Sequence, residues 1–262
     1  MLLRSSTLAA ALFILTAAPA FARGLDEIRE RGRLDIGLAL FTPWAMVRDD
    51  GILTGFEVEV GAGVALDMGV KPAFHLHDWD ELIPALESRR IDVVIAGMTV
   101  TPKRSQRVAF SLPYAEGEIG VAVNTRQVGR IDTLGELDKT GLRVGVVRKT
   151  VAEQAARRSL SQALRVPFFD SRRLLDALLD GEVGAYIGEQ PGPRFAALLH
   201  PGEIETPIAQ PLLSTREAMA VHKGDLELLA YLNRWIKQNR DQGWLDEVRN
   251  HWFGSLGWHR RE

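Results

Sequence analysis

The sequence predicts an α/β protein made of two lobes, with a ligand cleft between them. Short apolar strands alternate with helices over residues 33–96, and a second unit of the same kind begins near Ile119-Gly-Val-Ala-Val123. A returning strand near residue 218 rejoins the first unit, so the second unit is inserted into the first. The chain therefore crosses between the lobes twice, near residues 121–124 and 213–218. We expect the ligand between the lobes, at the carboxyl ends of the strands.

The first unit has a βαβαβ pattern. Its elements are predicted over residues 25–31 (helix), 33–39 (strand), 56–68 (helix), 71–76 (strand), 79–88 (helix) and 91–96 (strand). Gly32 follows the first helix, as is common at helix ends. The apolar run over residues 91–96 is typical of a strand that is covered on both faces. Such alternation indicates a mostly parallel sheet with helices on both sides.

The second unit and the C-terminal part continue the pattern. Elements are predicted over residues 142–147, 166–169, 184–187 and 218–221 (strands) and over 172–179, 226–239 and 244–252 (helices). Thr150-Val-Ala-Glu153 fits the capping box, in which the side chains of both end residues bond backbone amides at a helix start. Asp170 is expected to cap the helix that follows it.

The sequence predicts a candidate anion site just after the strand over residues 91–96. Gly97 ends this strand, and Thr101-Pro102 opens a helix with an N-cap side chain and a proline in the first turn. Arg104 lies in that first turn, where the helix dipole alone disfavours a cation. Beside Thr99 and free backbone amides, its guanidinium predicts a clamp for a carboxylate.

The first 22 residues read as a secretory signal. Arg4 supplies the positive start, the apolar core over residues 8–18 is too short for a stable membrane anchor, and Ala20-Phe21-Ala22 fits a cleavage site after Ala22. The chain has no cysteine, which excludes disulfides and a lipid anchor on cysteine. A net charge of −2 and the lack of a basic stripe argue against nucleic acid as a partner.

The segment over residues 91–114, IDVVIAGMTVTPKRSQRVAFSLPY, resembles the signature of bacterial periplasmic amino-acid-binding proteins of ABC transporters, whose fold is the type II periplasmic binding fold. The similarity continues in order through residues 41–44, 51–60, 79–86, 142–150, 181–189 and 243–254. This resemblance implies a protein that passes a small-molecule ligand to a membrane ABC permease without catalysis or a cofactor. From the signal and the lack of cysteine we expect it free in the periplasm, and a monomer is the simplest expectation. Lobe 1 is then expected over residues 23–120 and 216–262, and lobe 2 over residues 121–215.

The resemblance also implies how the main chain of an amino acid is held. Arg104 matches the arginine that holds the α-carboxylate, through the two parallel donors of its guanidinium. Gly97 and Thr99 match positions that meet the ligand through backbone and hydroxyl groups, and the amide of Thr150 points at an anion in the cleft. Glu189 stands where relatives usually carry an aspartate for the α-ammonium group. The alternative for Glu189 is an ion pair with a neighbouring cation, Arg148 or Lys149.

The ligand side chain is expected between two aromatic residues, Phe41 and Trp79, while Trp44 is either a third wall residue or core. Lys149 replaces the glycine expected before Thr150, and Leu38 replaces an acidic residue common at the end of its strand. Without that carboxylate, a cationic side chain loses its partner. These departures favour a neutral or acidic amino acid, with Lys149 as a partner for a second carboxylate.

Three other readings are weighed against this one. His75, His77 and Asp80 could approach one metal ion, since alternate strand residues share a face, but the sequence indicates no further ligand and we expect no metal. Some proteins similar to this family are cyclohexadienyl (arogenate or prephenate) dehydratases, in which Glu189 would be the general acid. A soluble sensor that docks a membrane receptor is the third alternative.

Overall fold

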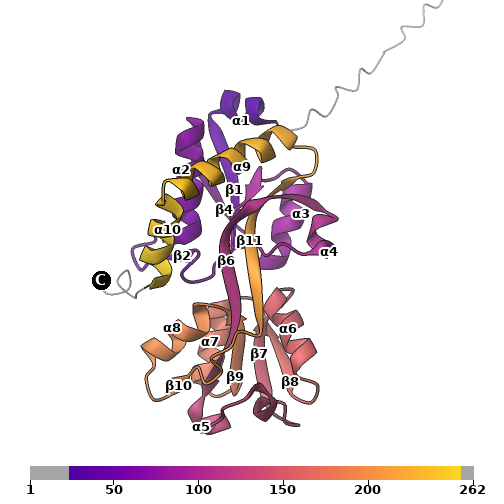
Figure 1. Ribbon diagram of the computed structural model, residues 1–262, viewed down its shortest axis with the longest axis vertical. Helices are drawn as coiled ribbons and strands as arrows, with labels where there is room; N and C mark the ends of the chain where they lie inside the picture. Colours follow the sequence, from indigo (N-terminus) through magenta and orange to yellow (C-terminus); the bar gives the residue numbers. More distant parts are fainter. Residues whose placement is uncertain (1–23, 255–262) are drawn as a thin grey trace, which may run out of the picture.

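The computed structural model describes residues 24–254 and shows two α/β lobes, one above the other, joined by two long strands (Figure 1). The predicted signal sequence, with cleavage after Ala22, lies outside the described residues. The fold class predicted from the sequence is confirmed. The lobe boundaries remain a prediction.

The first part of the chain forms most of the upper lobe in Figure 1. Its elements are α1 (Leu25–Arg31), β1 (Arg33–Leu38), β2 (Met46–Val47), β3 (Leu53–Thr54), α2 (Phe56–Met68), β4 (Lys71–Leu76), the 3₁₀ helix η1 (Trp79–Glu81), α3 (Leu82–Glu87), β5 (Val93–Val94), α4 (Pro102–Ser105) and β6 (Val108–Asn124). The strand expected over residues 91–96 is shorter than predicted, although the backbone of Ile95 still bonds to Gly37 of β1.

The second part forms the lower lobe and then returns. Its elements are α5 (Thr125–Val128), the 3₁₀ helix η2 (Leu134–Leu137), β7 (Arg143–Val147), α6 (Val151–Ser159), β8 (Leu164–Phe168), α7 (Ser171–Leu179), β9 (Ala185–Glu189), α8 (Gly192–Leu199), β10 (Ile204–Glu205), β11 (Leu213–His222), α9 (Leu226–Asp241), α10 (Trp244–Arg249) and the π-helical turn η3 (Asn250–Gly254). Helices α9 and α10 pack against the upper lobe, and α10 contacts α2.

One sheet runs through both lobes in the order β4-β1-β5-β11-β6-β9-β7-β8, and β10 pairs with β6. Strand β1 is parallel to β4 and β5, and β7 is parallel to β8 and β9. The two strands that cross between the lobes, β6 and β11, are antiparallel to each other. Each lobe is therefore a parallel sheet that borders a shared antiparallel pair.

The 17-residue strand β6 is longer than its sequence suggests. The sequence predicts an extended segment that ends near Tyr114 and a second unit that begins near residue 119, but no continuous strand that joins them. The structure accommodates Pro113 where the pairing of β6 with β11 is irregular, with register shifts on both sides of Ala218.

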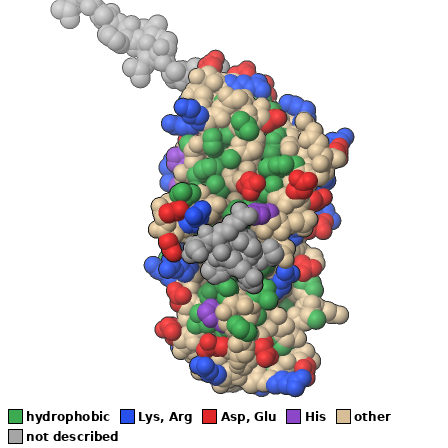
Figure 2. Space-filling model, turned by 90° about the vertical axis from the view of Figure 1, so that its left-hand side faces the viewer, with side chains coloured by type: hydrophobic (Ala, Val, Ile, Leu, Met, Phe, Trp, Pro, Cys, Tyr) green, Lys and Arg blue, Asp and Glu red, His purple; other side chains and the backbone are tan. Residues whose placement is uncertain are grey.

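Apolar side chains are buried on both faces of each parallel sheet. In the upper lobe one cluster packs under α2, α9 and α10, and another packs under α3. In the lower lobe one cluster packs under α6 and another under α7 and α8. Positive and negative side chains are interspersed over the face in Figure 2. Among residues 24–254, no helix is long and apolar enough to span a membrane.

Candidate functional site

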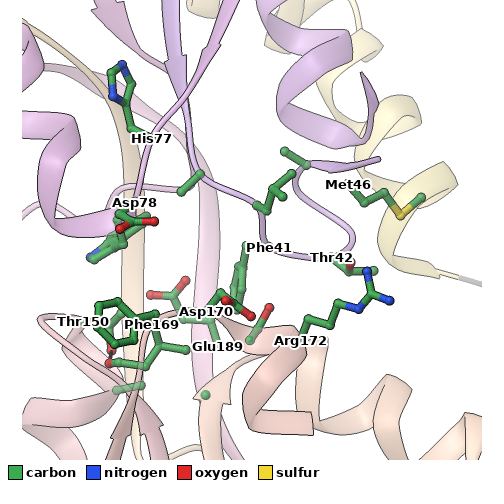
Figure 3. A pocket seen from close by; sticks show the side chains of 18 of the residues that line it. Phe41, Thr42, Met46, His77, Asp78, Thr150, Phe169, Asp170, Arg172 and Glu189 are labelled. Carbon is green, nitrogen blue, oxygen red and sulfur yellow. Dashed lines mark hydrogen bonds between the residues drawn. The ribbon is translucent and has the colours of Figure 1, made fainter. Parts of the chain in front are cut away.

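A cavity of about 390 Å³ lies between the lobes, within the size range of small-molecule sites (Figure 3). Its wall segments follow the carboxyl ends of parallel strands: residues 39–42 follow β1, 76–79 follow β4, and 169–172 follow β8. The predicted residues Phe41, Trp79, Thr150 and Glu189 line the cavity, whereas Gly97, Thr99, Arg104 and Lys149 are not among its lining residues. The cavity therefore has the position expected from the sequence.

Arg104 connects the two lobes beside this cavity. Its Nη1 donates to the carbonyl oxygen of Thr99 at 2.8 Å, and its Nη2 donates to the carbonyl oxygen of Lys149 at 3.4 Å. The guanidinium carbon lies 5.3 Å from the centroid of the Trp79 ring, a cation–π distance. Burial lowers the pKa of Arg104, while the negative charge of Glu189 opposes this shift. An arginine remains charged in such surroundings and retains further N–H donors for a ligand.

Glu189 ends β9 with its carboxyl group at the cavity (Figure 3). Its side chain is buried, and burial together with the nearby charge of Glu217 raises its pKa to about 8, against the opposing effects of Arg104 and the Thr99 hydroxyl. Thr99 Oγ1 is itself buried and has no hydrogen bond of normal geometry within the described part of the chain. A buried carboxylate is costly without a positively charged partner, so Glu189 is suited to a cationic group of the ligand.

Arg148 and Lys149 pair with Asp80, not with Glu189 as the alternative interpretation required. Asp80 Oδ1 accepts from Arg148 at 3.1 Å, and its Oδ2 accepts from Lys149 Nζ at 2.6 Å. The bond to Lys149 is the largest of the effects that lower the pKa of Asp80. Because Asp80 belongs to η1 of the upper lobe, these contacts join the lobes at the rim of the cavity.

The backbone of Lys149 has φ of +59°, in the left-handed region that favours glycine. This explains why a glycine is expected there. Since its ammonium group is held by Asp80, the structure removes the reason for treating Lys149 as the partner of a second ligand carboxylate.

Thr150 caps α6, but the capping box is only half formed. Thr150 Oγ1 accepts from the amide of Glu153 at 3.2 Å and donates to the carbonyl of Val147 at 2.7 Å. The Glu153 carboxylate accepts from the amide of Lys149 at 2.7 Å, where the sequence pattern predicted the amide of Thr150. The Glu153 carboxylate therefore bonds the amide before the N-cap residue and not the amide of Thr150 itself.

Gly97 and Trp44 are not among the residues that line the cavity. The amide of Gly97 donates to Tyr114 Oη at 3.2 Å, and this hydroxyl donates to Glu57 at 2.6 Å. Trp44 is buried, stacks on Phe41 with ring centroids 4.6 Å apart, and donates from Nε1 to Glu217 at 3.4 Å. Of the two roles open to Trp44, the structure therefore shows the core role, with Phe41 between it and the cavity.

The three residues of the metal hypothesis have other partners or surroundings. His75 Nε2 lies 2.8 Å from Asp35, and Asp80 is held by Arg148 and Lys149. His77 lines the cavity, and burial is the main cause of its lowered pKa. Within residues 24–254, no group of three or more potential ligands could hold a metal ion.

Sequence reasoning missed several residues near the site. Phe169, Arg172 and Tyr186 line the cavity, and Asp170 lines it while also capping α7. The rule that ligands meet the ends of parallel strands could have found those that follow β8. Glu57 and Glu217, both buried near Glu189, carry no such signal, because glutamates in a helix and a strand usually face solvent.

Comparisons with known proteins identify the family of this chain. The model of the family described as bacterial extracellular solute-binding proteins, family 3, matches residues 22–255. L-cystine-binding protein TcyJ of Escherichia coli is 31% identical over 239 residues, which cover 88% of this chain and 86% of that protein. Cyclohexadienyl dehydratase of Pseudomonas aeruginosa is 24% identical over 231 residues, which cover 87% of this chain and 85% of that protein.

Solved structures are similar over nearly the same range. The crystal structure of the ancestral amino acid-binding protein AncCDT-1, described as a precursor of cyclohexadienyl dehydratase, gives a TM-score of 0.81 at 31% identity and covers 87% of this chain and 99% of that one. An ancestral arginine-binding protein bound to arginine gives a TM-score of 0.74 at 29% identity and covers 85% of this chain and 99% of that one.

Proposed function

This protein is a member of the bacterial extracellular solute-binding proteins of family 3, and we propose that it captures a neutral amino acid between its lobes and delivers it to the permease of an ABC transporter. The observation that carries the proposal is the cavity at the ends of the parallel strands, with Glu189 on its wall and Arg104 beside it. A secretory signal cleaved after Ala22 would release the protein into the periplasm.

The main chain of the ligand would be held at both ends by charge. Arg104 and the amide of Thr150 bind the α-carboxylate, since a guanidinium and a helix start are both suited to anions. Glu189 binds the α-ammonium group through its carboxylate. Because Arg104 belongs to the upper lobe and Thr150 and Glu189 to the lower, the ligand contacts both lobes and favours the closed form.

The side chain of the ligand would pack between Phe41 and Trp79. A neutral side chain is favoured over an acidic one because Lys149 is already held by Asp80. It is favoured over a cationic one because Leu38 is buried apolar core and Asp170 is engaged as the cap of α7. Asp78 is an exposed carboxylate on the wall and argues for the cationic class, which relatives bind, so the two classes need a direct comparison.

The test is thermal unfolding of the mature protein with a panel of neutral, acidic and cationic amino acids, L-cystine and prephenate. A ligand that binds only the folded state raises the midpoint by an amount set by its concentration over its Kd. We expect the largest shift with a neutral amino acid. A larger shift with arginine or lysine would overturn the neutral class, and no shift with any amino acid would overturn amino-acid capture.

A second candidate function is favoured by one observation, the raised pKa of Glu189, about 8, which would keep a general acid protonated at neutral pH. The similarity to a cyclohexadienyl dehydratase favours the same class of activity. Incubation with prephenate decides between them. Product that forms with the natural protein and not with Glu189→Gln supports an enzyme, whereas no product leaves capture as the function.

We expect Asp80→Asn to weaken ligand binding about 3- to 10-fold, because it removes the charge that Arg148 and Lys149 contact across the rim when the lobes are together. Isothermal titration at low and high salt measures this, and the difference from the natural protein should shrink at high salt. Glu81→Gln is the matched control, since Glu81 lies in the same turn and pairs only loosely with Arg90, at 3.8 Å. An unchanged Kd for Asp80→Asn would show that these pairs do not support closure.

A further inference from the structure

Two buried glutamates besides Glu189 have no role in the proposed capture of an amino acid. Glu217 on β11 is 1% exposed and Glu57 on α2 is fully buried. One carboxyl oxygen of each, Oε1, has no hydrogen-bond partner within the described part of the chain. An unpaired buried carboxylate is costly, so these groups need either a proton or a cation.

The pairing of the strands directs Glu217 to the same side of the sheet as Glu189. Residues paired directly across strands share a face, and so do alternate residues of one strand. Leu213, two positions before Thr215 and four before Glu217, pairs with Ile119, and Ile119 pairs with Glu189. Thr99 forms an isolated bridge with Glu217 and therefore lies on this side as well.

Gly117 makes room for these oxygen atoms. A Cβ at Gly117 would lie 2.6 Å from both Glu217 Oε1 and Thr215 Oγ1, closer than real Cβ contacts. Thr215 Oγ1 is also buried and without a partner among the described residues. A Cβ at Gly97 would lie 3.6 Å from Glu217 Oε2. The carboxyl group of Glu217 is thus close to Gly97 and Thr99, the two residues expected to meet the ligand through backbone and hydroxyl groups.

We propose that Glu217 is a second carboxyl group of the ammonium-binding site, and that Glu189 and Glu217 together retain a proton in the empty cleft, which the ligand's ammonium group displaces to solvent. This inference rests on the proposed function and deepens it. No bond to carbon changes: one O–H bond of a carboxyl group breaks, and the proton passes to water or buffer. Amino-acid capture is therefore linked to pH.

Of the charged groups that face this pair, the acidic ones favour the retention of a proton and two cations oppose it. Arg104 of α4 is the cation that acts on Glu189, and Arg249 of α10 is the one that acts on Glu217. Glu57 of α2 is a further acidic group near the pair. The charge of Glu189 also contributes to the raised pKa of Tyr186 in β9. Burial raises the pKa of Glu217 to about 7, against Trp44 and Arg249, so two adjacent buried carboxyls titrate near neutral pH.

The first arm of the test uses the ligand-free protein. Carboxyl groups whose pKa is raised on folding bind more protons in the native state, so stability falls as pH rises through their native pKa values. We expect the unfolding midpoint of the natural protein to fall as pH rises from about 4.5, the usual pKa of a glutamate, to about 8, and to level off above that pH. The fall should be about half as large in Glu217→Gln and unchanged in the control Glu118→Gln, which replaces an exposed glutamate of β6.

The second arm is isothermal titration with the amino acid that gives the largest thermal shift, in two buffers of different ionisation enthalpy. We expect release of close to one proton at pH 7. Below about pH 7 the affinity should therefore increase as pH increases, by up to about tenfold per pH unit. Glu217→Gln should reduce both effects to less than half, and Glu57→Gln should reduce neither.

The possible outcomes separate the two proposals. Binding without proton release, or proton release that Glu217→Gln leaves intact, overturns the inference and leaves the proposed function standing. Loss of the release in Glu57→Gln alone would assign the proton to Glu57 and also overturns it. If no amino acid binds, the proposed function fails, and the ligand-free arm alone decides whether Glu217 and Glu189 retain a proton.

Discussion

Replacing Arg104 with alanine is expected to weaken amino-acid binding by about 2–4 kcal/mol, or roughly 30- to 1000-fold in Kd. The guanidinium is the cation placed by α4 beside the cavity, and its bonds to the carbonyls of Thr99 and Lys149 hold it between the lobes. Its removal leaves the ligand carboxylate without a charge partner, and it also removes a contact that favours closure. Isothermal titration with the ligand found in the panel measures the change.

Two variants show whether the effect belongs to the guanidinium. Lys103→Ala removes a neighbouring exposed cation of the same short helix and should leave Kd within about twofold, since exposed single charges contribute little. Arg104→Lys keeps the charge without the paired donors, and an intermediate loss is expected. A Kd for Arg104→Ala equal to that of the natural protein would contradict the carboxylate role. A loss of folding without ligand would appear in the ligand-free unfolding midpoint.

Replacing Gly97 with alanine is expected to lower the free energy of unfolding by about 2–4 kcal/mol. Gly97 has φ of +62°, which costs a residue with a side chain about 1 kcal/mol or more. A Cβ at this position would also lie 2.8 Å from Cδ1 and Nε1 of Trp44, whose ring is fixed between Phe41 and Phe253. Because the indole cannot move without disturbing both neighbours, the clash adds to the backbone cost. Chemical denaturation measures the change.

Gly32→Ala is the matched control for this prediction. Gly32 has nearly the same backbone conformation, φ of +67°, but a Cβ there would meet no atom within 4 Å. It should cost only about 1 kcal/mol, so the difference between the two variants measures the contact with Trp44. Equal losses in the two variants would mean that the indole moves aside freely.

The sequence by itself determined the elements that carry their own local signals. The bounds predicted for α1, α2 and β4 are those of the structure, because Gly32, Gly55 and Gly69 flank them and their apolar residues have the right spacing. The continuity of strand β6 was not predicted, since its length comes from pairing with β11 in one lobe and β9 in the other, which no local pattern encodes.

At the candidate site, order along the chain was enough to bring Phe41, Trp79, Thr150 and Glu189 to one cavity, because parallel strands present their carboxyl ends at one edge. Only the tertiary structure decided the rest. It paired Lys149 with Asp80 across the rim and packed Trp44 behind Phe41, and it buried Glu217 near Glu189. The physical reason is that the charge state of a side chain depends on burial and on neighbours distant in sequence, and these exist only once the lobes are assembled.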